Sequence, residues 1–81
     1  MSVESLVRMA NDIGHFFAAE PKRADAIAGI ANHIRRFWDP RMRAMMTQHL
    51  AHGGAGLNPI ALQATQQVCN PAAKSAAGGY S

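Results

Sequence analysis

The dipeptide Asp39-Pro40 constrains the fold of this chain more than any other feature of its sequence. Proline disfavours helical geometry in the residue before it, so a helix that arrives from the N-terminal side must end at Asp39. An aspartate can also cap the helix that follows, and proline suits the first helical position. The dipeptide therefore predicts two helices that meet at a corner almost without a loop. Asn58-Pro59 repeats this arrangement and predicts another helix start.

Apolar residues recur at helical spacing along the chain, without strand-like alternation. Ser2 can cap a first helix, Pro21 suits the first position of a second, and the glycines of residues 53–56 can end a third. We expect helices at about residues 3–18, 21–38, 40–51 and 59–68. The predicted fold is all-α: a small bundle of three main helices plus a short fourth, forming a single domain over residues 1–69 with proline-capped corners. Residues 70–81 are rich in small side chains and are predicted to form a flexible C-terminal tail.

Residues placed at 100° intervals indicate which face of each helix is buried. In the first helix this face consists of Val3, Leu6, Val7, Ala10, Ile13, Gly14 and Phe17. In the second it consists of Ala24, Ile27, Ile30, Ala31, Ile34, Phe37 and Trp38. The third presents Met42, Met45, Met46, His49 and Leu50, and the fourth has a thin apolar line of Ile60, Ala64 and Val68. Met9 and Phe16 form a second apolar stripe beside the main face of the first helix.

The small size of the chain indicates that it depends on a partner. A domain of 81 residues is near the size at which folding buries only about 60% of the surface of the unfolded chain, so its stability is marginal. An internal disulfide is excluded, because Cys69 is the only cysteine. A partner is therefore the expected source of additional stability.

The sequence also predicts a cytoplasmic location. No apolar run approaches the roughly 18 residues that a membrane-spanning helix requires. Residues 1–4 lack the basic and then apolar pattern of a secretory signal. A single cysteine without a pairing partner is typical of a reducing compartment.

Catalytic and metal-binding patterns have little support in the sequence. The glycines of residues 53–56 are accompanied neither by a lysine nor by a preceding strand, as a phosphate-binding loop would require. Cys69 has no histidine nearby in sequence and is better interpreted as a small hydrophobic residue. His49 and His52 could supply two zinc ligands, but zinc sites usually need three or four. We expect His49 instead to pack on the methionine face, with a ring nitrogen bonded to a backbone carbonyl. His15 and His33 are expected at the surface or at its rim.

The positive charge of the chain is concentrated in residues 35–43, which carry four arginines against one aspartate and contribute +3. Three interpretations remain open: a solvated basic face, a nucleic-acid site or a protein interface. A nucleic-acid site would need a broader basic footprint, whereas residues 1–34 are net acidic. Arginine, tryptophan and methionine are the side chains enriched at protein interfaces. The candidate interface residues are Arg35, Arg36, Phe37, Trp38, Asp39, Pro40, Arg41, Arg43, Met9 and Phe16.

Three stretches, residues 8–17, 30–43 and 53–59, closely resemble the delta subunit of NAD-dependent formate dehydrogenase. The resemblance covers about residues 6–62. Its most distinctive part is the string Phe37-Trp38-Asp39-Pro40-Arg41-Met42-Arg43.

This resemblance implies a role in a soluble bacterial molybdenum enzyme that oxidises formate to carbon dioxide and reduces NAD. In that family the large alpha subunit carries bis-molybdopterin guanine dinucleotide with molybdenum, together with iron–sulfur clusters. The beta subunit carries FMN and the NAD site, and the gamma subunit carries a further cluster. The delta subunit has no known catalytic residue, so no catalytic, cofactor-binding or metal-binding residue is expected in this chain.

The resemblance therefore implies a non-catalytic accessory subunit that supports assembly or stability of the alpha subunit. Two alternatives remain: a transient chaperone for insertion of the molybdenum cofactor, and a small nucleic-acid-binding protein. We expect the alpha subunit to be the partner, with beta and gamma in the same complex, and neither nucleic acid nor membrane to be bound.

Overall fold

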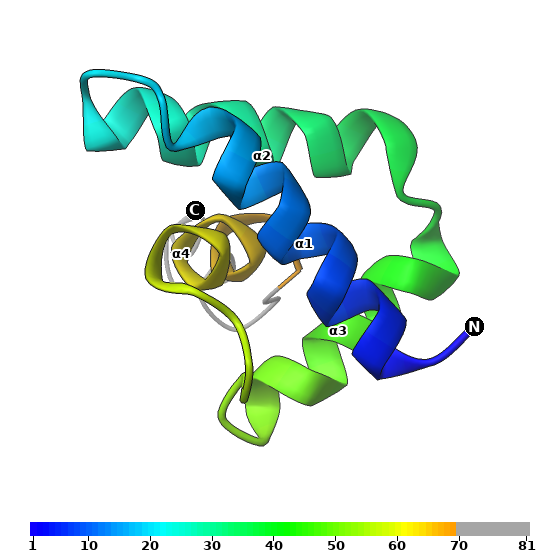
Figure 1. The fold of residues 1–81 in the computed structure, drawn as a ribbon. Helices are drawn as coiled ribbons and strands as arrows, with labels where there is room; N and C mark the ends of the chain where they lie inside the picture. The colour runs from blue at the N-terminus through cyan, green and yellow to red at the C-terminus, as the bar shows by residue number, and fades with distance from the viewer. Residues whose placement is uncertain (70–81) are drawn as a thin grey trace, which may run out of the picture.

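The computed structural model describes residues 1–69, which form four α-helices (Figure 1). The helices are α1 (Val3–Phe17), α2 (Arg23–Phe37), α3 (Pro40–Ala51) and α4 (Pro59–Cys69). No strand occurs within residues 1–69, and the predicted all-α fold is confirmed. The predicted flexible tail, residues 70–81, lies outside the described residues.

Three side chains cap the helices as the sequence predicts. Ser2, Asp39 and Asn58 each accept a hydrogen bond from the amide three residues ahead, over 3.2, 2.9 and 2.9 Å. Each cap satisfies one of the amide groups that the first turn of a helix leaves without an intrahelical partner.

The predicted start of the second helix is wrong. α2 begins at Arg23, two residues after Pro21, and its N-cap is Lys22, whose side chain makes no capping bond. The reason lies in the end of α1: the amide of Glu20 bonds to the carbonyl of Phe17 over 3.0 Å, so Pro21 belongs to the connecting turn. The fixed φ of proline is also compatible with such a turn.

The glycine segment ends α3 as expected. The amides of Gly53 and Gly54 donate to the carbonyls of Leu50 and His49 over 3.0 and 2.9 Å. Gly53 has a φ of +108°, a backbone conformation that residues other than glycine rarely adopt. These two bonds form the pair that commonly closes a helix at its C-terminus.

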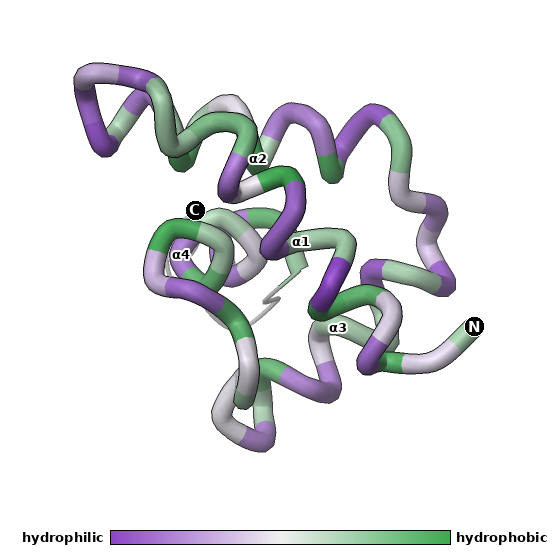
Figure 2. Tube along the Cα trace, in the orientation of Figure 1, coloured by the Kyte–Doolittle hydropathy of each residue, from purple (hydrophilic) through white to green (hydrophobic). Residues whose placement is uncertain are grey.

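The four helices enclose one core. α1 crosses α2, which in turn packs extensively on α4, while α3 closes the other side of the bundle (Figure 1). Hydrophobic and hydrophilic residues are interspersed along every helix, and the α1–α2 connection is mostly hydrophilic (Figure 2). The core cluster consists of Leu6, Ala10, Ile27, Ile30, Ala31, Ile34, Trp38, Met42, Met46, Ala61, Ala64 and Cys69. None of the helices within residues 1–69 combines the length and apolar composition needed to cross a membrane.

Two predictions of buried faces are wrong in part. Ala24 is exposed, because it lies in the first turn of α2, next to the connection from α1. In α4 the fully buried side chains are those of Ala61, Ala64, Thr65 and Cys69, whereas Ile60 and Val68 are half-buried. Small side chains let α4 approach its neighbours closely. The buried hydroxyl of Thr65 donates to the carbonyl of Ala61 over 2.9 Å and is therefore satisfied.

Asn11 ties the loop between α3 and α4 to α1. Its Nδ2 donates to the carbonyl of Gly56 over 2.9 Å, and its Oδ1 accepts from the amide of Asn58, also over 2.9 Å. Asn58 then caps α4. One side chain of α1 therefore fixes the position at which α4 begins.

Candidate interaction surface

Trp38 is a core residue at the corner between α2 and α3. It is the C-cap of α2, and its backbone is extended rather than helical, with φ −88° and ψ 129°. Its side chain is only 3% exposed and belongs to the core cluster. Asp39 and Pro40, both exposed, follow as the cap and first residue of α3. The predicted corner is thus confirmed, with the tryptophan anchored inside.

The prediction that Phe37 points inward is wrong, since its side chain is 64% exposed. Helical spacing assigns Phe37 and Trp38 to the same face only if the helix continues through both. Because Trp38 has left the helix, its ring turns into the core while Phe37, the last residue of α2, stays on the outer side. The corner therefore has one buried and one exposed aromatic ring.

Arg43 holds the corner together from α3. Its Nε donates to the carbonyl of Trp38 over 3.2 Å, and its Nη2 donates to the carbonyl of Arg35 over 3.4 Å. These carbonyls lie at the C-terminal end of α2, where backbone oxygens lack helical partners. Two donors of this interface candidate are therefore used within the fold.

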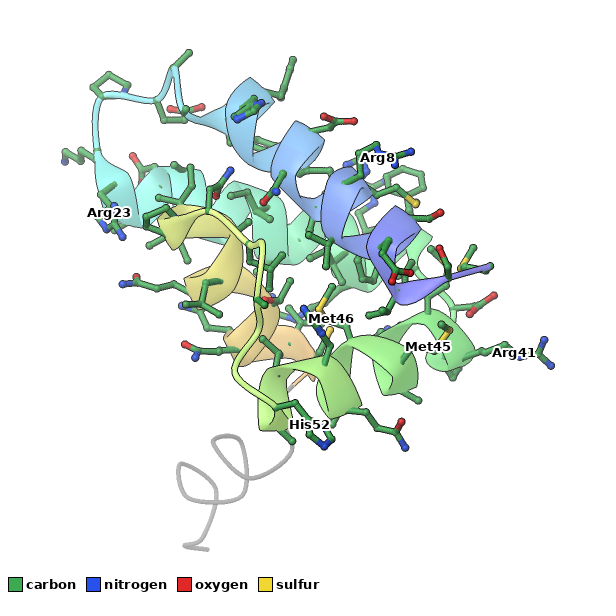
Figure 3. All side chains as sticks on the ribbon, turned by 60° about the horizontal axis from the view of Figure 1, so that its bottom comes forward. Arg8, Arg23, Arg41, Met45, Met46 and His52 are labelled. Carbon is green, nitrogen blue, oxygen red and sulfur yellow. The ribbon has the colours of Figure 1, made fainter. Side chains whose placement is uncertain are left out.

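Three arginines remain displayed around the corner. Arg35, Arg36 and Arg41 are exposed, and Arg35 donates to the side chain of Asn32 over 3.3 Å. Within residues 1–69, none of the hydrogen bonds of the arginines at this corner ends on a carboxylate. Arg41 lies at the opposite end of the molecule from Arg23 (Figure 3). The corner thus presents positive charge that the described fold leaves available.

A second group of candidates lies on α1. Phe16 is 76% exposed and Met9 is 37% exposed, so both lie outside the core. A groove of about 360 Å³ lies beside Phe16 and is lined by Asp12, Ile13, Phe16, Phe17 and His33. The groove joins α1 to α2, and its wall is mainly apolar.

His33 connects the groove to the corner. Its ring lies 4.7 Å from the ring of Phe37, centroid to centroid, and the guanidinium of Arg36 lies 5.7 Å from the same phenylalanine ring. Phe16 and His33 thus line one groove, and Phe37 and Arg36 continue from His33 along α2. We call Met9, Phe16, His33 and Phe37, together with this groove, the α1/α2 face.

The sequence interpretation missed His33 as a member of this face. His33 and Phe37 are four residues apart on one helix, a spacing that places side chains side by side. That spacing was the available signal. Its proximity to Phe16 depends on how α1 packs on α2, which no local pattern encodes.

A family model described as NADH-dependent formate dehydrogenase delta subunit FdsD matches residues 5–65. The chain belongs to this family. The resemblance found in the sequence is thereby confirmed. The curated proteins and the solved structures contain no significant match to the chain. The matched residues include the whole α1/α2 face and the corner.

Cys69 lies outside the matched residues and is only 3% exposed. Burial raises the pKa of its thiol to about 11, against the opposing effect of the Arg43 guanidinium. The thiolate is the reactive form of cysteine, and it is scarce at neutral pH when the pKa is this high. The geometry favours the predicted role of a small buried hydrophobic residue.

Two histidines lie near the C-terminal end of α3. A ring nitrogen of His49 lies 2.8 Å from the carbonyl of Ala55, as expected for a ring bonded to the backbone. Nδ1 of His52 lies 2.8 Å from the carbonyl of Gln48. Within residues 1–69, no group of three or more histidine, cysteine, aspartate or glutamate side chains could hold a metal ion.

Proposed function

We propose that this chain is a non-catalytic accessory subunit of a cytoplasmic NAD-dependent formate dehydrogenase complex. In this proposal it binds the large alpha subunit and supports its assembly and stability. Membership of the delta-subunit family supports a place in a formate dehydrogenase complex, and the exposed aromatic residues support a role in binding.

The observation that carries the proposal is the exposure of two phenylalanines on so small a bundle. Phe16 and Phe37 are 76% and 64% exposed, although large aromatic side chains usually contribute to a core. Contiguous apolar patches at a protein surface mark interaction sites. The proposed partner would cover these rings and add the buried area that a chain of this size lacks.

The proposal assigns the redox groups to other subunits: bis-molybdopterin guanine dinucleotide with molybdenum, iron–sulfur clusters and FMN. Iron–sulfur clusters are held mainly by several cysteine thiolates. This chain offers one cysteine, Cys69, whose thiol is buried. Its donor set therefore does not fit a cluster.

The test is expression of the complex with and without this chain. We expect the chain to co-purify with the alpha subunit in a fixed ratio, and its deletion to lower both the soluble alpha subunit and its molybdenum content. The amount of soluble beta subunit is the internal control. Unchanged alpha subunit and molybdenum content after deletion would contradict the proposal. A chain that is needed for molybdenum loading but missing from the mature complex would instead indicate a transient chaperone.

A further inference from the structure

We propose that the α1/α2 face binds an amphipathic helix of the partner subunit, whose acidic residues meet the arginines at the Phe37 end. This inference rests on the proposed function for the identity of the partner as the alpha subunit. Beyond that function, it specifies the surface that binds, the helical structure of the bound segment and the end of that segment at which its acidic residues lie.

The shape of the face fits a helix. The groove between α1 and α2 is open rather than enclosed, so it does not surround a small molecule as a typical ligand pocket does. Met9 and Phe16 are seven residues apart, about 10 Å along a helix axis. A face of this length accommodates the side chains that a helix presents at intervals of three, four and seven residues. Strand addition needs a free sheet edge, and residues 1–69 contain no strand.

The rings that border the groove are held in place before binding. Phe16 makes an edge-to-face contact with Phe17, with ring centroids 5.1 Å apart. Phe17 in turn lies against Gly29, so closely that a Cβ at Gly29 would lie 2.4 Å from its ring. His33 packs against Phe37 at the other end. A face with rings already positioned loses less conformational entropy when it binds than a flexible face does.

The charges around the face determine the chemistry of the partner helix. At one end, Arg36 lies beside Phe37, and Arg35 and Arg41 are exposed at the adjoining corner. The one acidic side chain in the groove wall is Asp12, which lines it together with Phe16 and Phe17. Carboxylates of a partner would be attracted to the arginines beside Phe37 and repelled by Asp12 in the groove wall. The bound helix is therefore apolar along its inner side and acidic toward Phe37.

Competition during assembly tests the surface. A tagged variant and the untagged wild-type chain are co-expressed with the other subunits, and their ratio in the purified complex is measured by mass spectrometry. We expect Phe16→Ala and Phe37→Ala to reduce incorporation at least about tenfold, as interface anchors do. We expect Arg36→Glu and Arg41→Glu to reduce it as well. Since all four side chains are exposed, circular dichroism should show unchanged folding.

The matched controls are Gln66→Ala, at an exposed residue of α4 outside the α1/α2 face, and Arg23→Glu, at the opposite end of the molecule from Arg41. Both should incorporate like the wild-type chain. Full incorporation of the Phe16 and Phe37 variants would overturn the inference and leave the proposed function intact. Failure of the wild-type chain to join the complex would overturn both.

Photo-cross-linking identifies the occupant. A photoreactive phenylalanine analogue replaces Phe16 or Phe37 in the full chain, and the cross-linked peptides of the assembled complex are sequenced. We expect one segment of the alpha subunit with apolar residues at helical spacing and with aspartate or glutamate on the side cross-linked from position 37. Cross-links to a second copy of this chain, to a segment with strand-like alternation, or to a segment without acidic residues would each overturn the inference.

Discussion

The side chain of Asn11 bonds to Gly56 and Asn58, which lie 45 and 47 positions further along the chain. Its removal therefore tests how the fold is held together. Asn11→Ala leaves the carbonyl of Gly56 and the amide of Asn58 without their partners. Gly14 shows how closely α1 approaches this loop, because a Cβ there would lie 3.2 Å from the side-chain amide atoms of Asn58. Water could therefore replace the lost bonds only in part.

The expected loss follows from the burial of the two orphaned groups. Gly56 is exposed, so water can reach its carbonyl and the loss there is about 0.5 kcal/mol. Asn58 is half-buried, and an unsatisfied amide at such a place costs about 1.5 kcal/mol. Together the free energy of unfolding should fall by about 2 kcal/mol. In a domain of this size that corresponds to a decrease in Tm of about 8–16 °C.

Urea and thermal unfolding, followed by far-ultraviolet circular dichroism, measure this loss. Asn32→Ala is the control, because Asn32 is exposed and accepts a single hydrogen bond, from Arg35 over 3.3 Å. Its effect should remain within about 0.5 kcal/mol. If Asn11→Ala were equally mild, Asn11 would not hold the loop against α1, and the account of how α4 is positioned would be wrong.

Three further predictions concern the core. Trp38→Ala should lower the free energy of unfolding of the isolated chain by about 3–5 kcal/mol in urea titrations, whereas a loss below about 1 kcal/mol would show that Trp38 is not a core anchor. Gly29→Ala should lower the free energy of unfolding by about 1–3 kcal/mol in the same assay, although alanine has the better helix propensity, because its Cβ would clash with the ring of Phe17. Combining it with Phe17→Leu should reduce this loss, and an undiminished loss would show that the clash is not its cause. The pKa of the Cys69 thiol is about 11 in the folded chain and near 9.0 in the unfolded chain. The free energy of unfolding should therefore fall as pH rises from 9 to 11, because only the unfolded chain releases the proton easily in that range. In urea unfolding measured across this pH range, Cys69→Ala should lose less stability than the wild-type chain. Identical pH profiles for the two proteins would show that the pH dependence does not come from Cys69.

The number of helices and most of their ends could be predicted from local chemistry. Asp39-Pro40 and Asn58-Pro59 combine a cap with a proline, and both effects act within one turn of the chain. The glycine at position 53 ends α3 for an equally local reason, its positive φ. Such features are encoded by neighbouring residues, so they can be read without knowledge of the packing.

The parts that escaped prediction depend on how helices meet. The rotation of α4 is tied to its start at Asn58, which Asn11 holds from another helix. Arg43 is one of four similar arginines in the sequence, and only the angle between α2 and α3 brings it to the carbonyls of Trp38 and Arg35. The position of Phe37 was mistaken because helical spacing was applied across the end of a helix.

The most distinctive string of the chain, residues 37–43, therefore contains two kinds of residue. Trp38 and Arg43 maintain the corner, through burial and through bonds to the end of α2. Phe37 and Arg41 are exposed and have no such task in the described fold. Substitution of the first kind should act through stability, and a loss of binding there would not identify an interface. The second kind separates the two effects, because a change at Phe37 or Arg41 can weaken binding while the bundle stays folded.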